Sequence, residues 1–496
     1  SDLSAIDALK AVWHRGAVDA DGKTGDGAGI HVDLPVRFFD DAIADSGHKV
    51  LPNKLAVGMV FLPRTDLQAQ ETCRTIVESE IIEAGYTIYG WRQVPVNIAV
   101  IGDKAQRTRP EIEQIMIAGP MPDEQNIAEF EKQLYLVRRR IENKVIAAQI
   151  SDFYICSLSC RSIIYKGLFL AESLSVFYPD LVDPRFESRI AIFHQRYSTN
   201  TFPQWWLAQP FRCLAHNGEI NTIRGNKNWM KSHEIKMASL AFGENSEDIK
   251  PVIPAGASDT AALDAVFEAI CRSGREAPTA KIMLVPEAWQ GDQVLPPEHK
   301  AMYEYMASVM EPWDGPAALA MTDGRWAVAG VDRNALRPLR YSLTNDNLLV
   351  IGSETGMVVL PESSIVEKGR LGPGQMIAVD LHEGRFYHDR AIKDRIAAEQ
   401  PYRDLVKGFR SIHDLPPAGP DSIAEMNRAE LTRRQVAAGL TIEDMETILA
   451  PMAEDGKEAI GSMGDDTPLA VVSAKPRPIA QFFRQNFSQV TNPPID

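Results

Sequence analysis

Residues 317–332 read AALAMTDGRWAVAGVD, and this stretch decides the fold class of the chain. It holds two candidate β-strands that follow each other with no helix between them. Residues 347–354 (NLLVIGSE) add another strand-like run a short way downstream. Further candidates lie at residues 54–62, 96–102, 153–160 and 189–198. Neighbouring strands without intervening helices favour an antiparallel α+β architecture over strict β-α-β winding.

The composition is that of an ordinary globular protein. Of the 496 residues, 45% are hydrophobic and 24% are charged, which excludes disordered, collagen-like and low-complexity classes and predicts two to four domains. Lys and Arg number 52 against 67 Asp and Glu, so the net charge is −15. A general nucleic-acid or anionic-membrane binder would carry the opposite sign.

The cysteines and the apolar runs predict where the protein resides. Five cysteines are few, and odd in number, for a secreted protein of this length. The first residues, SDLSAIDALKAVWHRG, contain no signal-peptide core, and apolar runs such as residues 55–62 are too short to span a membrane. We therefore expect a cytoplasmic protein without a membrane partner.

A cluster of Pro and Gly at residues 415–420 (LPPAGP) marks a domain boundary. Beyond it we expect a helix over residues 424–435 and another that begins at Thr441, where Asp444 completes a capping box. Near the N-terminus, residues 3–13 carry apolar side chains at helical spacing. The chain stops on TNPPID with no closing element, so we expect it to be cut there.

Two cysteine motifs have spacings that could indicate a metal site or a catalytic site. Cys156 and Cys160 lie about 13 Å apart if they share a strand, with no His or further Cys close by in the sequence, so buried thiols are the better interpretation. Cys213 and His216 have the residue types of a nucleophile and its base. An odd offset on a strand, however, places them on opposite faces, and a Cys213 hydrolase stays a minor hypothesis.

A glycine-rich segment, residues 22–29, could be taken for a phosphate-binding loop. It follows a predicted helix rather than a strand, and its spacing matches no phosphate-binding motif. A tight structural turn is therefore expected.

Residues 216–219 (His-Asn-Gly-Glu) place a side-chain amide beside a glycine N–H, which is what an oxyanion hole requires. An ordinary hairpin turn would also explain Asn217 and Gly218. Arg196 follows a β-rich run and offers a cation for an α-carboxylate, while Asp259 opens a predicted helix and offers an anion for an α-ammonium group. An exposed salt bridge would explain either charged residue equally well.

Five ordered motifs together resemble the class II glutamine amidotransferases, the type with an N-terminal cysteine nucleophile. They are Trp13-His14-Arg15-Gly16, His194-Gln195-Arg196-Tyr197-Ser198-Thr199, His216-Asn217-Gly218-Glu219, Ser258-Asp259 and Asp332-Arg333-Asn334-Ala335-Leu336-Arg337-Pro338. A second set narrows the resemblance to the large subunit of the glutamate synthase family. This set lies at residues 20–29, 220–226, 308–318, 368–374, 455–466 and 482–496.

The resemblance implies a fold and a domain division. Residues 1–410 would form a four-layer αββα domain of the N-terminal-nucleophile hydrolase type. Residues 411–425 would be a linker, and residues 426–496 the beginning of an α/β central domain.

The same resemblance implies hydrolysis of L-glutamine to glutamate and ammonia, which is then used for reductive amination of 2-oxoglutarate. Arg196 would hold the glutamine α-carboxylate with help from Thr199, and Asp259 would hold the α-ammonium group. Asn217 and the Gly218 N–H would form the oxyanion hole. No metal or cofactor is expected in this fragment. The full-length enzymes of the family use FMN and an iron–sulfur cluster, with a small NADPH-oxidising subunit or ferredoxin as partner.

The sequence departs from the family at its first residue. Family members begin with the nucleophilic cysteine, whereas this chain begins Ser1-Asp2-Leu3 and enters a predicted helix at once. We therefore expect a chain truncated at both ends that is inactive as it stands. The alternatives are a catalytically inactive glutamine-binding or regulatory module and catalysis by Ser1.

Overall fold

The structure is a computed structural model that describes residues 2–196, 202–235, 241–416, 426–456 and 469–474, together with positions 476, 477, 479 and 482. Contacts divide the chain into two units, Ser1–Gly408 and Phe409–Asp496. Within the described residues, no helix is both long and apolar enough to cross a membrane.

The larger unit is a mixed α+β fold in which all assigned strand pairs of the described residues are antiparallel, and this confirms the predicted class. One sheet has the order β3-β4-β2-β5, from β2 (Leu55–Leu62), β3 (Thr87–Gln93), β4 (Glu111–Ala118) and β5 (Tyr154–Ser159). A second has the order β6-β1-β7, from β1 (Ala28–Asp33), β6 (Ser162–Gly167) and β7 (Ala191–Gln195). A third has the order β15-β14-β10-β9-β8, from β8 (Leu214–Gly218), β9 (Ala317–Thr322), β10 (Trp326–Val331), β14 (Met376–Asp380) and β15 (Arg385–Tyr387). The last has the order β12-β11-β13, from β11 (Arg340–Thr344), β12 (Leu349–Gly352) and β13 (Ile365–Arg370).

Residues 317–332 form the hairpin β9–β10, as the sequence predicts. Thr322 pairs with Ala327 at the turn end of the hairpin. The Asp323 carboxylate accepts hydrogen bonds from the N–H groups of Arg325 at 2.9 Å and Trp326 at 2.8 Å. Gly324 takes a φ of +87°, which glycine adopts without strain. The aspartate and the glycine thus close the turn together.

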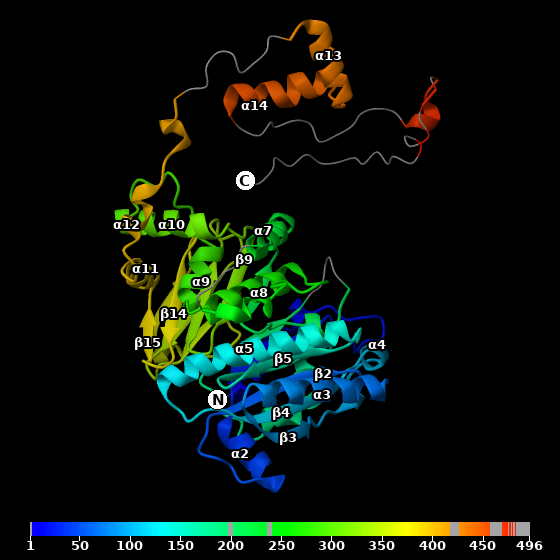
Figure 1. The fold of residues 1–496 in the computed structure, drawn as a ribbon, viewed down its shortest axis with the longest axis vertical. Coiled ribbons are helices and arrows are strands. Elements are labelled where there is room, and N and C mark those ends of the chain that lie inside the picture. Colours follow the sequence, from blue (N-terminus) through cyan, green and yellow to red (C-terminus); the bar gives the residue numbers. More distant parts are fainter. Residues whose placement is uncertain are drawn as a thin grey trace. The chain divides into compact units, whose positions relative to one another are not determined.

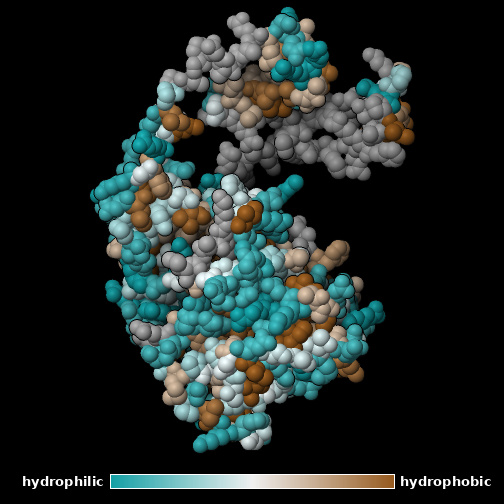
Figure 2. All heavy atoms as spheres, in the orientation of Figure 1, coloured by the Kyte–Doolittle hydropathy of each residue, from teal (hydrophilic) through white to brown (hydrophobic). Residues whose placement is uncertain are grey.

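The continuous apolar run of β2 is buried on both faces of its sheet. Val57 and Met59 belong to a core shared with β1 and β6. Ala56 and Val60 pack on the other side, in a core that includes helices α3 (Leu67–Glu83) and α5 (Glu124–Ala147). Figure 1 shows these two helices along this sheet, and Figure 2 shows that the surface above them is mostly hydrophilic.

A further core lies between the five-stranded sheet and a group of helices (Figure 1). These helices are α8 (Asp259–Arg272), α9 (Ala277–Leu284), α10 (Pro297–Val309) and α11 (Asp389–Ala397). Nearly all of α8 is buried, and it lies against β8, the edge strand of that sheet. The remaining helices of this unit are α1 (Asp2–Ala11), α2 (Val36–Asp45), α4 (Asp103–Arg107), α6 (Leu174–Phe177), α7 (Ile223–Ile235) and α12 (Tyr402–Leu405).

One predicted strand is wrong. Within residues 96–102 the structure has a short 3₁₀ helix, Ile98–Val100, instead of the predicted strand. The Asn97 side chain accepts a hydrogen bond from the Ala99 N–H at 3.1 Å, and such a local bond competes with strand pairing. Ile98 is 48% exposed, so apolar character at this position does not report burial.

The smaller unit contains α13 (Arg428–Ala437) and α14 (Ala450–Asp455). The predicted capping box is confirmed: the Thr441 N–H donates to Asp444 Oδ2 at 2.8 Å, and the Asp444 N–H donates to Thr441 Oγ1 at 3.1 Å. Ser1, residues 417–425 of the predicted linker and most of the motifs at 455–466 and 482–496 lie outside the described residues.

Candidate active site

A cavity of about 990 Å³ lies in the larger unit and brings together the predicted site residues. Its wall includes parts of β7, β8, β9, β10 and β12 and the start of α8. Arg196, Asn217, Gly218 and Asp259 all line it, although they come from three separate stretches of sequence. Thr199 lies outside the described residues.

Asn217 and Gly218 occupy the last two positions of β8, where they pair with Ala318 and Ala317 of β9. The alternative of a hairpin turn at these residues is therefore wrong. Gly218 has a φ of +146°, and a Cβ placed on it would lie 1.7 Å from the Pro316 carbonyl oxygen. Only glycine allows this close approach, which fixes the peptide that joins Asn217 to Gly218.

Asp259 is the first residue of α8, and the Ser258 side chain caps that helix by accepting a hydrogen bond from the Ala261 N–H at 3.1 Å. The two carboxylate oxygens of Asp259 have different partners. Oδ1 accepts from the Thr260 N–H at 2.7 Å, and Oδ2 accepts from the Ile220 N–H at 2.9 Å. The carboxylate is therefore held in one orientation at the cavity wall, beside the segment that follows Gly218.

Arg196 follows directly after β7, and its backbone N–H donates to the Gly27 carbonyl oxygen at 2.8 Å. Its side chain is buried at the cavity wall. Burial lowers the pKa of Arg196, and the carboxylates of Asp26 and Asp259 oppose that shift. An arginine stays protonated throughout the ordinary pH range, so Arg196 places a cation in the same wall as the Asp259 carboxylate.

The glycine-rich segment supports this arrangement and is not a phosphate site. Gly27 has a φ of +133° and supplies the carbonyl that holds Arg196. A Cβ on Gly25 would lie 2.7 Å from the backbone of Phe169, and one on Gly29 would lie 2.6 Å from the Lys166 Cβ. The glycines allow close backbone packing, as expected for a structural turn.

Two histidines line the cavity, the half-buried His194 from β7 and the buried His216 from β8. Burial lowers the pKa of His194 to about 3, and His216 and Arg196 add to the effect. Burial also lowers the pKa of His216, although Asp259 opposes the shift. Both imidazoles are thus neutral near pH 7. His216 Nδ1 lies 3.0 Å from Thr260 Oγ1, a contact to α8 that the sequence did not reveal.

Glu354 lies directly after the cavity-wall residue Ser353, and sequence reasoning missed it. Its carboxylate pairs with His14 Nε2 at 3.0 Å and with the Arg15 guanidinium. Burial raises the pKa of Glu354, but hydrogen bonds from Arg15 and His14 outweigh this effect and lower it. The pairs explain why histidine and arginine stand together at positions 14 and 15. No local signal identifies Glu354, because its partners are more than 300 residues away.

None of the five cysteines lines this cavity. Cys213 is 1% exposed, and burial raises the pKa of its thiol well above the ordinary value. Cys156 and Cys160 are also buried free thiols, as predicted. The hypothesis of a Cys213 hydrolase is therefore wrong, because the thiol reaches neither the cavity nor the thiolate state. Among the described residues, no group of three or more His, Cys, Asp or Glu is placed to hold a metal ion.

Comparison with known proteins gives a consistent answer. The family of class-II glutamine amidotransferases matches residues 3–405, and the glutamate synthase central domain matches residues 433–496. The glutamate synthase [NADPH] large chain of Azospirillum brasilense is 62% identical over 495 residues, which cover 99% of this chain and 32% of that protein. Ferredoxin-dependent glutamate synthase 2 of Synechocystis is 43% identical over 501 residues, which cover 99% of this chain and 31% of that protein.

Two solved structures show weaker likeness. The glutamine phosphoribosylpyrophosphate amidotransferase from B. subtilis is 19% identical with a TM-score of 0.27, over 46% of this chain and 40% of that chain. A structure described as the allosteric regulatory enzyme of purine biosynthesis is 13% identical with a TM-score of 0.29, over 73% of this chain and 48% of that chain.

The chain spans about a third of the length of the curated relatives that it matches. The family match covers most of the chain and includes every residue placed in the cavity above. The chain therefore belongs to the class-II glutamine amidotransferases, and its amidotransferase domain is that of a glutamate synthase.

Proposed function

We propose that the larger unit binds L-glutamine and hydrolyses it to glutamate and ammonia, and that the whole protein uses this ammonia for the reductive amination of 2-oxoglutarate. The observation that carries the proposal is the convergence of Arg196, Asp259 and the Asn217–Gly218 pair on one cavity. A free α-amino acid has an anion and a cation on the same carbon, and in this wall Arg196 and Asp259 offer a group of opposite sign to each.

In this proposal the two charged side chains bind and orient the substrate. Arg196 holds the α-carboxylate through its planar guanidinium, and Asp259 accepts hydrogen bonds from the α-ammonium group. Thr199 assists Arg196. With its α-carbon held, glutamine extends its side chain so that the γ-carbonyl reaches Asn217 and Gly218.

The chemical step needs a nucleophile at that carbonyl. A cysteine sulfur attacks the carbonyl carbon of the γ-carboxamide, the carbonyl π electrons move to oxygen, and the oxyanion accepts hydrogen bonds from the Asn217 amide and the Gly218 N–H. The proton that the thiol gives up passes to the amide nitrogen, and the tetrahedral adduct collapses to a thioester with loss of ammonia. Water then cleaves the thioester to release glutamate and regenerate the thiol.

We propose that this cysteine comes from a segment outside residues 1–496, since none of the five cysteines here lines the cavity. Two features support an added strand as its carrier. Both β7 and β8 are edge strands of the sheets that the described residues form, and both lie in the cavity wall. An edge strand can accept another strand where its backbone groups are unpaired, and in β8 the N–H groups of Leu214 and His216 already donate to Asp264 and Gln209.

The absence of a cysteine from the cavity wall also favours a second candidate function. A cavity that holds the binding residues but no thiol would suit a catalytically inactive glutamine-binding or regulatory module. Binding and hydrolysis must therefore be measured separately.

For the whole protein we propose an αββα amidotransferase domain over residues 1–410, a linker over 411–425, and the start of a central domain over 426–496. Four of the five cysteines are buried free thiols and Cys271 is half-buried, and the described residues include no group of three or more His, Cys, Asp or Glu that would suit an iron–sulfur cluster. We therefore place the FMN and the iron–sulfur cluster of the full-length enzyme outside this chain. A small NADPH-oxidising subunit or ferredoxin would be its partner, and five unpaired thiols support a cytoplasmic location.

Asn217→Ala in the full-length protein tests the proposal. Loss of one oxyanion donor lowers kcat by about 10²- to 10³-fold, measured as ammonia released from glutamine. Asn143→Ala is the matched control, because Asn143 of α5 donates to the backbone carbonyl of Asp248 and does not line the cavity. An unchanged kcat in Asn217→Ala would contradict the oxyanion assignment. Saturable glutamine binding by a full-length protein that releases no ammonia would support the inactive module instead.

A further inference from the structure

Helix α8 holds strand β8 at three points along its length. Asp259 accepts from the Ile220 N–H just beyond the strand. Thr260 Oγ1 contacts His216 within the strand. Asp264 accepts from the backbone at the beginning of the strand. One helix thus carries both the candidate ammonium ligand and the residues that fix the strand bearing Asn217 and Gly218.

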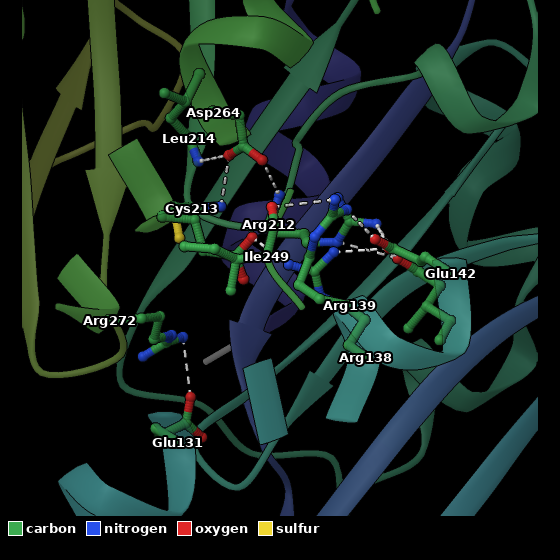
Figure 3. Close-up of polar contacts among 12 residues, drawn as sticks. Glu131, Arg138, Arg139, Glu142, Arg212, Cys213, Leu214, Ile249, Asp264 and Arg272 are labelled. Carbon is green, nitrogen blue, oxygen red and sulfur yellow. Dashed lines mark hydrogen bonds and ion pairs between the residues drawn. The ribbon is translucent and has the colours of Figure 1, made fainter. Parts of the chain in front are cut away.

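Asp264 makes the most extensive of these contacts, as Figure 3 shows. Its Oδ1 accepts hydrogen bonds from the N–H groups of Cys213 at 2.8 Å and Leu214 at 3.1 Å. Its Oδ2 accepts from the Arg212 N–H at 3.2 Å. Three successive backbone donors therefore converge on one carboxylate that is 1% exposed.

Burial of a charged carboxylate at this position costs free energy. Burial and the neighbouring Glu268 raise the pKa of Asp264 to about 6, while hydrogen bonds from Cys213 and Arg212 and the charge of Arg212 oppose the shift. A buried apolar residue would avoid the cost but would leave three backbone N–H groups without an acceptor. The position therefore demands an acceptor of this geometry.

The beginning of β8 is fixed from a second side by the Arg212 side chain. Its guanidinium donates to Glu142 of α5 at 2.8 Å and to the Ile155 carbonyl of β5 at 2.8 Å. Figure 3 shows this guanidinium directed toward Glu142, away from the Asp264 carboxylate. The backbone of residues 212–214 thus depends on Asp264, while the Arg212 side chain ties the same segment to other elements.

Placement of this segment matters because β8 is short and has β9 as its one strand neighbour in the described sheet. Leu214 and Asn217 are about 10 Å apart along an extended strand, so a shift at one end moves the other. A slip of one residue would turn every side chain of β8 to the opposite face. Catalytic geometry is sensitive on this scale, since a misplacement of about 1 Å can cost about 10²-fold in rate.

We propose that Asp264 is a positioning residue for amide hydrolysis, which fixes the Asn217–Gly218 oxyanion hole through the backbone of β8. Asp264 does not line the cavity and does not contact the substrate. The proposal rests on the proposed function of the cavity, because it names a residue that serves the same site.

The test compares Asp264→Asn and Asp264→Ala with Glu268→Gln in the full-length protein. Asparagine retains the acceptor for Cys213 and Leu214 but turns an amide N–H₂ toward the Arg212 N–H. Alanine removes all three bonds. Glu268 is the matched control, because it lies one turn further along α8, is also buried, and pairs with Arg138 of α5 at 2.5 Å rather than with β8.

We expect kcat for glutamine hydrolysis to fall about 10-fold in Asp264→Asn and about 10²-fold in Asp264→Ala, with KM within about threefold of the unmodified protein. Glu268→Gln should lower the unfolding temperature and leave kcat within about twofold. The γ-semialdehyde of glutamate, whose thiol adduct carries an oxyanion, should lose affinity in parallel with kcat. L-Glutamate, which uses Arg196 and Asp259 alone, should bind unchanged.

Equal effects of Asp264→Asn and Glu268→Gln on kcat would overturn the proposal, because both would then report stability alone. Parallel losses of affinity for the semialdehyde and for glutamate would also overturn the proposal. If Asp264→Ala fails to fold, the nearly isosteric asparagine variant decides the question. An unmodified full-length protein that releases no ammonia from glutamine would instead refute the proposed function itself.

Discussion

Asp259, the first residue of α8, accepts a hydrogen bond at 2.9 Å from the backbone N–H of Ile220, which stands two positions after Gly218. The group proposed to bind the substrate ammonium is thereby tied to the group proposed to bind the oxyanion. The proposed substrate-binding residue and the proposed oxyanion hole therefore share one hydrogen-bonded frame.

Asp259→Asn should raise the KM for glutamine about 10- to 100-fold with a smaller change in kcat, because a neutral amide loses the charged hydrogen bond to the α-ammonium group. Initial rates over a range of glutamine concentrations in the full-length protein measure this. Asp66→Asn is the control, since Asp66 caps α3 by accepting from the Ala69 N–H, away from the cavity wall. An unchanged KM in Asp259→Asn would show that the carboxylate does not bind the substrate.

Gly218→Ala should abolish glutamine hydrolysis, because the new methyl group would lie 1.7 Å from the Pro316 carbonyl oxygen and force the strand end to move. Gly225→Ala provides the contrast. Gly225 is an exposed residue of α7 with open space around its Cβ direction, and alanine there should stabilise the helix by about 0.5–1 kcal/mol. Ammonia release and urea unfolding of both variants test the pair. Full activity in Gly218→Ala would contradict the close approach.

His31→Leu should reduce the sensitivity of the fold to acid. Burial and the charge of Arg272 lower the pKa of His31 from 6.5 to about 4, while Glu131 opposes the shift. Between these values the unfolded chain binds a proton that the folded protein does not, so stability falls as the pH drops from about 6.5 toward 4. At pH 5 this one group costs about 2 kcal/mol relative to pH 7.5.

Urea unfolding of unmodified protein and His31→Leu at pH 5 and pH 7.5 measures the difference. Neither ring nitrogen of His31 has a hydrogen-bond partner within the described structure, so leucine leaves no donor or acceptor without its partner. The stability lost between the two pH values should be smaller in the variant. An identical loss in both proteins would mean that His31 does not contribute to the acid response.

Cys213→Ala should leave the rate of glutamine hydrolysis unchanged and lower stability by about 1 kcal/mol, since the thiol is a packed core group that does not line the cavity. Ammonia release and thermal unfolding of the full-length protein test both parts. Loss of activity without loss of folded protein would restore the rejected Cys213 hydrolase.

Much of the fold followed from local patterns. The hairpin of residues 317–332 formed as predicted because two strand-forming runs flank a turn that Asp323 and Gly324 can close. Ser258 capped α8, and Thr441 with Asp444 formed the capping box, since both bonds join residues close in the chain. The strand predicted at residues 96–102 is wrong because Ile98 there is exposed, and sequence alone does not report burial.

The sequence by itself determined the family, the α+β class and the residue types of the candidate site, because these depend on motifs and on the local energetics of turns and caps. The tertiary structure alone placed Arg196, Asn217 and Asp259 in one cavity wall. It also revealed Glu354 against His14 and Arg15, and the three backbone bonds to Asp264. These contacts join residues from tens to hundreds of positions apart, and only the packing of helices on sheets determines which of them meet.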